Sequence, residues 1–202
     1  MNPVPRPPHT VTEKFGGVTV IRFVTKRLFD SGTIQAVGNE LYRLPDELGL
    51  ANLVVDCSEL TQVSSVILGK FITLARKVHL AHGKLVFCCV PSLLLEFFQI
   101  TKLDKILTVA PRPPFETAAQ VVSEFFGELV RPVTFTPAWR TDTAVAVARQ
   151  IHDSGDFGGM PILADALQDA GSEDEHILMH CRDASQPHTR ACWVCARVLS
   201  LG

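Results

Sequence analysis

The sequence predicts an α/β domain with a mixed β-sheet and flanking helices, followed by a small, mainly helical C-terminal appendage. Two patterns predict the domain: short runs of β-branched and other apolar residues, and longer stretches between them with apolar residues at helical spacing. A third pattern predicts the appendage, because helix caps and glycine or proline stop signals recur after residue 139. Strands that alternate with helices favour a sheet whose strands run parallel.

The N-terminal part of the domain begins with a predicted hairpin. Residues 10–15 and 18–24 alternate apolar and polar side chains around a Gly-Gly pair, which tolerates the backbone of a tight turn. A helix is expected next, since Asp30 can cap residues 31–44, whose apolar side chains recur at helical spacing. Pro45 should end or kink that helix. The hairpin adds an antiparallel portion to the sheet, which is therefore expected to be mixed.

From residue 53 onward the pattern changes to strand–helix repeats. Leu53, Val54 and Val55 form the short β-branched run of a strand that is covered on both faces. Further strands are expected at residues 84–90 and 106–109, and helices at residues 65–81, 91–98 and 115–126. Cys88 and Cys89 fall inside one of these strands, where neighbouring side chains face opposite sides, so both are expected to fill the core.

These signals divide the chain into four parts. Residues 1–9 are a Pro-rich leader, residues 10–127 the domain, residues 128–138 a linker, and residues 139–202 the helical segment of unknown function. Helices in the last part are expected at residues 144–151, 162–170 and 173–182, while residues 191–201 fit either a helix or a strand. A segment this small should have little core of its own and dock on the domain or on a partner.

Composition and charge argue against several function classes. A hydrophobic share of 47% supports a folded core, and a net charge of -2 lacks the basic excess that nucleic-acid binding uses. No apolar run reaches the roughly 18 residues of a membrane span. Six cysteines without a secretion signal favour reduced thiols and a cytoplasmic location. Without a Gly-x-Ser-x-Gly, phosphate-loop or His-Glu-x-x-His motif, neither enzyme activity nor a cofactor is expected.

The most informative stretch runs from Leu53 to Phe71. Its strand ends at Asp56, a polar loop follows, and Ser64 and Ser65 open an amphipathic helix. A serine hydroxyl in the first turn of a helix lies beside unpaired backbone N–H groups and can carry a phosphate. This arrangement favours a signalling protein over an enzyme.

The motifs Asp-Cys-Ser at residues 56–58, Val-Ser-Ser at 63–65 and Leu-Gly at 68–69 resemble the STAS family of sulphate-transporter and anti-sigma-factor-antagonist domains. The resemblance covers residues 10–127 and includes the predicted order of strands and helices. It implies a STAS-like mixed sheet in a bacterial regulator of transcription. The C-terminal segment resembles a short segment of uncharacterised bacterial proteins, to which no activity is attached.

Antagonist-type members of this family carry Asp-Ser-Ser-Gly-Leu-Gly at the start of this helix, and a kinase that is also the anti-sigma factor phosphorylates the first serine. In this chain Ser65 takes the place of that serine, and Ser64, the second choice for phosphorylation, takes the place of the acid. The resemblance implies a partner-binding set of five residues: Ser64, Ser65, Val66, Ile67 and Lys70. A solvated surface lysine is the other interpretation of Lys70.

The resulting hypothesis is partner switching between proteins. The unphosphorylated domain would bind an anti-sigma factor or related serine kinase, phosphorylation of Ser65 would weaken that complex, and a phosphatase would restore it. Two alternatives stay open. The domain could be a constitutive docking or scaffold module whose serines only cap the helix, or a sensor for a small ligand.

Histidine and cysteine residues gather in the C-terminal segment. A zinc site is often marked by two Cys-x-x-Cys motifs, but the one at residues 192–195 stands alone, so no metal is expected. The alternative is a zinc site formed by four residues: His180, Cys181, His188 and Cys192.

Overall fold

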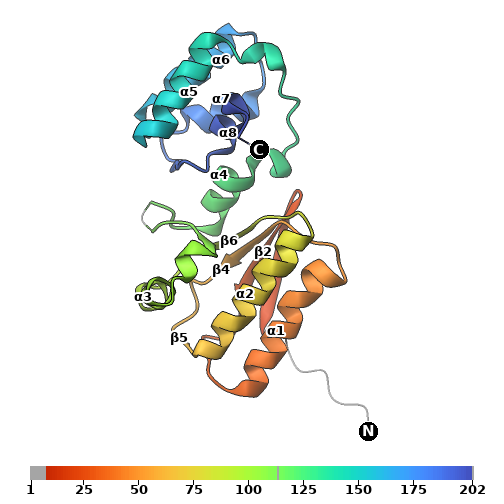
Figure 1. Ribbon diagram of the computed structural model, residues 1–202. Coiled ribbons are helices and arrows are strands. Elements are labelled where there is room, and N and C mark those ends of the chain that lie inside the picture. Colours follow the sequence, from red (N-terminus) through yellow and green to blue (C-terminus); the bar gives the residue numbers. More distant parts are fainter. Residues whose placement is uncertain (1–7, 113, 202) are drawn as a thin grey trace. The chain divides into compact units, whose positions relative to one another are not determined.

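The computed structural model describes residues 8–112 and 114–201 (Figure 1). The chain forms two compact units, one up to Ala118 and the other from Ala119 onward. Residues 1–7 of the predicted Pro-rich leader lie outside the described residues.

A mixed five-stranded sheet, with the strand order β1-β2-β4-β6-β7, forms the centre of the first unit. The strands are β1 (Thr10–Phe15), β2 (Val18–Phe23), β4 (Leu53–Asp56), β6 (Leu85–Cys88) and β7 (Thr108–Val109). β1 and β2 form the predicted antiparallel hairpin, and β2, β4, β6 and β7 run parallel. β4 is buried along its whole length and has a neighbouring strand on each edge. The predicted α/β class and mixed sheet are confirmed.

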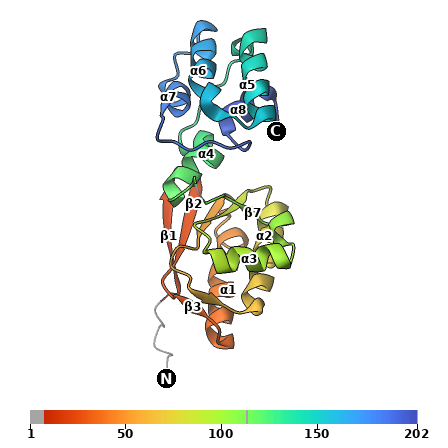
Figure 2. The same ribbon diagram turned by 90° about the vertical axis from the view of Figure 1, so that its left-hand side faces the viewer.

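Three helices, α1 (Ser31–Asp46), α2 (Ser65–Leu80) and α3 (Ser92–Ile100), cover one face of this sheet (Figures 1 and 2). Phe71 of α2 lies at the centre of their shared core. Its ring centroid is 5.0 Å from that of Phe87 in β6 and 6.3 Å from that of Phe23 in β2. These contacts hold α2 directly over the parallel strands, so the start of α2 has a defined position at the rim of the sheet.

Two local expectations differ from the structure. α1 continues to Asp46, one residue past Pro45, since a proline in the last turn removes few of the hydrogen bonds that a helix makes. β6 ends at Cys88, and Cys89 adopts a left-handed backbone with φ of 51°, so these two cysteines do not face opposite sides of one strand. Both side chains are nevertheless buried, as expected of core residues.

A short parallel strand pair that the sequence pattern does not reveal brings the chain to α2. β3 (Arg27–Leu28) pairs with β5 (Gln62–Val63), and the Ser64 N–H donates to the Leu28 carbonyl oxygen over 2.9 Å. Two-residue strands carry no periodicity, so only the pairing identifies them. The pair fixes where the polar loop after β4 ends and where α2 begins.

The second unit is helical and has its own core, which corrects the expectation of a segment with little core. Its elements are α4 (Ala118–Val130), α5 (Asp142–Ser154), α6 (Met160–Asp169), α7 (Glu175–Arg182), α8 (Trp193–Leu199) and two short 3-10 turns, Pro137–Trp139 and Phe157–Gly159. Buried residues from α5, α6, α7 and α8, with Ile151, Leu163 and Val198 among them, form one cluster. The segment at residues 191–201, which fitted either a helix or a strand, contains the helix α8.

The boundary between the units falls earlier in the chain than residue 127. Nearly all of α4 belongs with the second unit, and residues 128–130 are helical instead of part of a linker. Gly127 approaches the Trp193 indole so closely that a Cβ would overlap it, and Arg197 pairs with Glu128 over 2.5 Å. Such long-range contacts explain the difference, because local pattern alone groups α4 with the strands before it.

Among the described residues, no helix combines the length and apolar character needed to cross a membrane.

We expect Gly83→Ala to lower the free energy of unfolding by about 1–3 kcal/mol, since its Cβ would overlap the Ala51 carbonyl group, which is backbone and cannot swing away. Gly69→Ala is the matched control. Nothing lies within 4 Å of a Cβ at Gly69, in the middle of α2, so this change should raise stability by about 0.5–1 kcal/mol. Urea denaturation followed by circular dichroism measures both changes, and equal effects would contradict the close approach at Gly83.

Candidate functional site

The candidate site lies at the start of α2, where the chain arrives from the β3–β5 pair. Ser64 is the N-cap residue, with extended backbone (φ −93°, ψ 161°), and Ser65 is the first residue of the helix. Ser65 is exposed, whereas Ser64 is partly buried. The structure therefore presents Ser65 to solvent beside the first-turn N–H groups, as the sequence predicts for a residue that can carry a phosphate.

The Ser64 hydroxyl does not act as a helix cap. It makes no hydrogen bond to the first turn of α2, and its oxygen is buried without a partner among the described residues. Asp30, the N-cap residue of α1, shows the usual arrangement, in which the carboxylate accepts from the Thr33 N–H over 2.7 Å. The interpretation of Ser64 as an ordinary cap is therefore wrong.

The remaining residues of the predicted partner-binding set do not all face outward. Val66 is 59% exposed, whereas Ile67 is completely buried in the core below α2 and is not available to a partner. One residue along a helix turns the side chain by about 100°, which explains the difference. Lys70 is only partly exposed, because its ammonium donates to Gln35 of α1 over 2.8 Å and lies 5.8 Å from the ring centroid of Tyr42.

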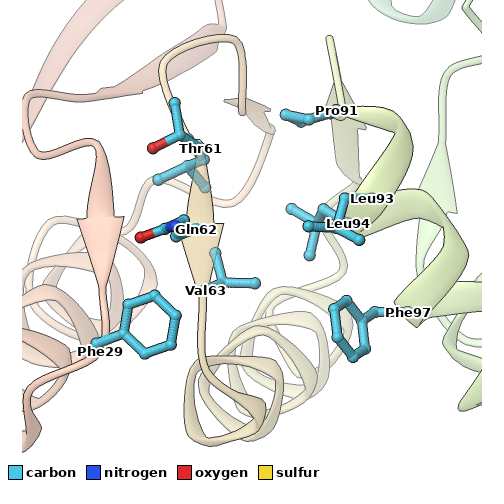
Figure 3. A pocket seen from close by; sticks show the side chains of 9 residues that line it. Phe29, Thr61, Gln62, Val63, Pro91, Leu93, Leu94 and Phe97 are labelled. Atoms are coloured by element: carbon cyan, nitrogen blue, oxygen red, sulfur yellow. The ribbon is translucent and has the colours of Figure 1, made fainter.

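An apolar pocket of about 320 Å³ opens directly before these serines (Figure 3). We call it the β5–α3 groove, and it is lined by Phe29, Leu60, Thr61, Gln62, Val63, Pro91, Leu93, Leu94 and Phe97. Figure 3 shows Val63 facing Leu93, Leu94 and Phe97 across the opening. Phe29, Leu93 and Phe97 are all more than two-fifths exposed, so the groove presents apolar surface to solvent.

Sequence reasoning missed this groove, although α3 carried a signal of it. The helix reads Ser-Leu-Leu-Leu-Glu-Phe-Phe-Gln-Ile, and apolar residues occupy more of its circumference than one buried stripe can hold. Leu94 and Phe98 are buried, which leaves Leu93 and Phe97, four residues apart, on the exposed side. The β5 wall of the groove had no comparable signal, because its strand is two residues long.

Asp56, at the end of β4, stabilises the loop that leads to the site. One carboxylate oxygen accepts from the Ser58 N–H over 3.0 Å, and the other lies 3.4 Å from the Arg22 guanidinium. No acidic residue occupies the first turn of α2. The helix start therefore offers an uncompensated positive end to an anion on Ser65.

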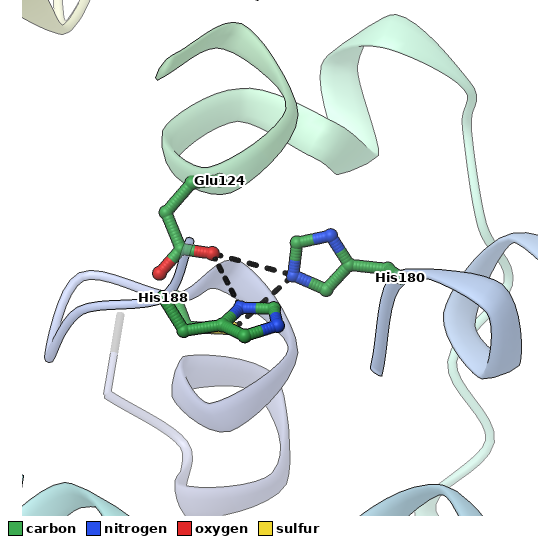
Figure 4. A group of neighbouring side chains, drawn as sticks. Glu124, His180 and His188 are labelled. Atoms are coloured by element: carbon green, nitrogen blue, oxygen red, sulfur yellow. Dashed lines mark hydrogen bonds and ion pairs between the residues drawn. The ribbon is translucent and has the colours of Figure 1, made fainter. Parts of the chain in front are cut away.

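In the second unit, three of the four residues of the alternative zinc set come together, and the fourth does not. His180, His188 and Cys192 converge with Glu124 of α4, and their donor atoms all lie within 4.8 Å of one another (Figure 4). Cys181 is buried but lies outside this group, and burial raises the pKa of its thiol well above the ordinary value. Glu124 replaces it from a helix far away in sequence.

The group is electrostatically coupled. Burial opposes charge on His188, but contacts with Cys192 and Glu124 raise the pKa of this histidine to about 9. Although burial also opposes charge on Glu124, hydrogen bonds from His180 and His188 hold the pKa of this carboxyl below its ordinary value. Burial raises the pKa of the Cys192 thiol. The carboxylate is thus ionised and the thiol protonated at neutral pH in the metal-free protein.

Comparison with known proteins identifies the first unit. Residues 9–120 match the family model of the STAS domain. Among solved structures, a Thermotoga maritima protein assigned as an anti-sigma factor antagonist is 10% identical, with a TM-score of 0.48 over 56% of this chain and 92% of that chain. The Bacillus cell fate determinant SpoIIAA in its phosphorylated form is 14% identical, with a TM-score of 0.42 over 51% of this chain and 92% of that chain. A search of curated proteins found no significant match.

Ser64→Ala should leave the free energy of unfolding unchanged or raise it by up to about 1 kcal/mol, because it removes a buried hydroxyl that lacks a partner. Loss of a functioning N-cap serine would instead lower it by about 1 kcal/mol. Asp30→Ala, which removes a cap that does accept a backbone hydrogen bond, is the control and should lower stability. Urea midpoints compare the variants, and a loss on Ser64→Ala would show that its hydroxyl caps α2.

Proposed function

This chain belongs to the STAS domain family, and we propose that it is a regulator that works by partner switching, in the manner of an anti-sigma factor antagonist. Ser65 is the residue proposed to carry the switch. The single observation that supports this most strongly is the exposure of Ser65 at the first position of α2, two residues beyond Val63 of the β5–α3 groove. Two residues span at most about 7 Å, so a charge on Ser65 would lie at the rim of the groove.

The docking surface in this proposal is the β5–α3 groove together with Val66. Exposed apolar side chains that gather around a pocket are typical of protein interfaces, where they lose contact with water when a partner binds. Phe29, Leu93 and Phe97 provide such side chains from two separate segments. A partner would insert an apolar side chain or helix face into the groove and cover Ser65 at its edge.

Phosphorylation would oppose this docking by electrostatics and desolvation. A phosphate on Ser65 adds a charge of about −1.5 to −2, which a partner would have to bury beside apolar surface. The positive end of α2 can hold the phosphate without rearrangement of the helix, since no acid in the first turn competes for it. The complex would therefore weaken while the fold of the domain stays the same.

The proposed partners are proteins, and the chemistry belongs to them. We infer an anti-sigma factor with serine kinase activity, which would bind the domain and transfer phosphate to Ser65, and a phosphatase that removes it. Lys70 is not proposed as a main contact, because Gln35 and Tyr42 hold it against α1.

A constitutive docking module is the second candidate. The observation that favours it is the start of α2, where Ser64 stands in place of the acid and Ile67 in place of the glycine of the antagonist pattern. A kinase that requires these two features would not phosphorylate Ser65, and the groove alone would then define the function.

We expect Ser65→Asp to weaken capture of the native partner by about tenfold or more, whereas Ser65→Ala should bind like the unchanged chain. The partner is captured from native cytosol on the full-length chain, identified by mass spectrometry, and its dissociation constant is then measured with each variant. His79→Asp is the charge control, since its carboxylate would lie roughly 21 Å further along α2.

A kinase test on the purified partner with ATP completes this experiment. Intact mass should increase by one phosphate on the unchanged chain and not on Ser65→Ala. Equal affinity for the unchanged chain, Ser65→Ala and Ser65→Asp, without phosphorylation, would contradict the switch and support the constitutive docking module.

Leu93→Asp should reduce affinity for the same partner by at least tenfold, because it places a charge in the β5–α3 groove. Ile100→Asp is the matched control on the same helix. Ile100 is 78% exposed and does not line the groove, so its change should leave affinity within about twofold. A similar loss with both variants, or with neither, would contradict the groove as the docking surface.

A further inference from the structure

The cluster of Glu124, His180, His188 and Cys192 in the second unit serves no part of the proposed switch. Glu124 comes from α4 and His180 from α7, while His188 and Cys192 come from the segment between α7 and α8. All four side chains are shielded from solvent, with exposed fractions of 0% for the Glu124 side chain, 2% for His180 and 7% for His188. Cys192 is also completely buried.

We propose that Glu124, His180, His188 and Cys192 bind one zinc ion in a closed tetrahedral site that holds the second unit together. Carboxylate oxygen, imidazole nitrogen and cysteine sulfur are the donor atoms that zinc uses in proteins. Four protein ligands leave no open coordination position, so the site is structural and not catalytic.

Two distances within the cluster match the edges of such a tetrahedron, and a third is shorter. Usual zinc–ligand bond lengths place neighbouring donor atoms about 3.3–3.6 Å apart. The His180 Nε2 atom lies 3.3 Å from the Cys192 sulfur and 3.4 Å from Oε2 of Glu124, and the His188 Nδ1 atom lies 3.0 Å from the same oxygen. Figure 4 shows both imidazole rings turned toward this one carboxylate oxygen.

The carboxylate is held in the orientation that a single-oxygen ligand needs. Its other oxygen, Oε1, accepts the backbone N–H of Thr189 over 2.6 Å. This hydrogen bond comes from the residue next to His188, so it fixes Glu124 against the same segment that supplies two other donors. Outer hydrogen bonds of this kind position the ligands of known metal sites.

Hydrogen bonds alone account less well for the convergence. The Nε2 atom of His180 carries at most one proton, so one N–H would have to be shared between the Cys192 sulfur and the Glu124 oxygen, which weakens both contacts. A zinc ion would satisfy all these donor atoms from one central position. Binding would release to solvent the thiol proton of Cys192 and the extra proton of a protonated imidazole such as that of His188. The ion, one carboxylate, one thiolate and two neutral imidazoles would then sum to zero charge. A neutral site is compatible with this degree of burial.

The site would stabilise the segment between α7 and α8, residues 183–192, which contains neither helix nor strand. His188 and Cys192 would attach this segment through the ion to α4 and α7. Small units commonly gain stability from a structural metal because the site exists only in the folded state.

Elemental analysis of the full-length chain tests the proposal, after expression with added zinc and removal of any purification tag. We expect about one zinc ion per chain, and loss of it in Cys192→Ala and His180→Ala. Cys195→Ala and Cys181→Ala are matched controls, since both remove buried thiols of the same unit, and neither residue belongs to the cluster. These two variants should keep the zinc. Zinc retained equally in Cys192→Ala and Cys195→Ala would overturn the site.

A second measurement does not depend on variants that fold. The unchanged chain is stripped with a chelator and titrated with zinc chloride against a colorimetric chelator, and then with cobalt chloride. We expect one tight site, a higher thermal midpoint with zinc, and a thiolate-to-cobalt absorption band of tetrahedral character. A chain that remains folded but shows no stoichiometric binding and no shift of the midpoint would overturn the proposal. Stoichiometric binding of another metal in place of zinc would overturn the assignment to zinc.

A variant that retains the fold can measure the contribution of the carboxylate. Glu124→Gln keeps the shape of the side chain and removes its charge. Loss of a residue that only hydrogen-bonds to a metal ligand lowers metal affinity by about 10- to 100-fold. Because Glu124 would itself be a ligand, zinc affinity should fall by about 100-fold or more. Unchanged affinity would remove Glu124 from the ligand set.

Discussion

The packing of α2 over the central strand β4 is the constraint on which the rest of the first unit depends. β4 has a neighbour on each edge and no exposed residue, so the chain that leaves Asp56 must return over the face of the sheet. The return runs through β5, whose pairing with β3 brings Ser64 to the start of the helix. Because Ile67 and Phe71 are buried below α2, Ser65 is turned toward solvent.

The same packing separates the stable part of the site from the part proposed to change. The core under α2 is apolar and closely packed, with the Phe71 ring between those of Phe23 and Phe87. The proposed phosphate would sit on the opposite side of the first turn, at the rim of the β5–α3 groove. A change of charge there alters what a partner must desolvate and leaves the core contacts intact, which is what a reversible switch requires.

The second unit is organised by polar contacts as well as by its apolar core. Leu163, Ile151 and Val198 pack together among its helices, as local amphipathic patterns predict. The segment between α7 and α8 has no such pattern, and its position depends on His188 and the neighbouring residues that contact Glu124. A buried carboxylate among imidazoles and a thiol is costly unless every group has a partner, which is the physical reason that the proposed ion fits there.

The sequence by itself determined the class of the fold, the hairpin, the presence of most helices and the exposed position of Ser65, because these depend on local periodicity and turn residues. It also offered His180, Cys181, His188 and Cys192 as an alternative to the absence of a metal, since residue type limits what can bind one, and three of these four residues come together in the structure. Only the tertiary structure decided which surfaces and clusters form. Val63 and Leu93 line the same groove, and Glu124 contacts His188, which lies 64 positions further along the chain. No local sequence pattern predicts such contacts, because they depend on how whole helices and strands pack.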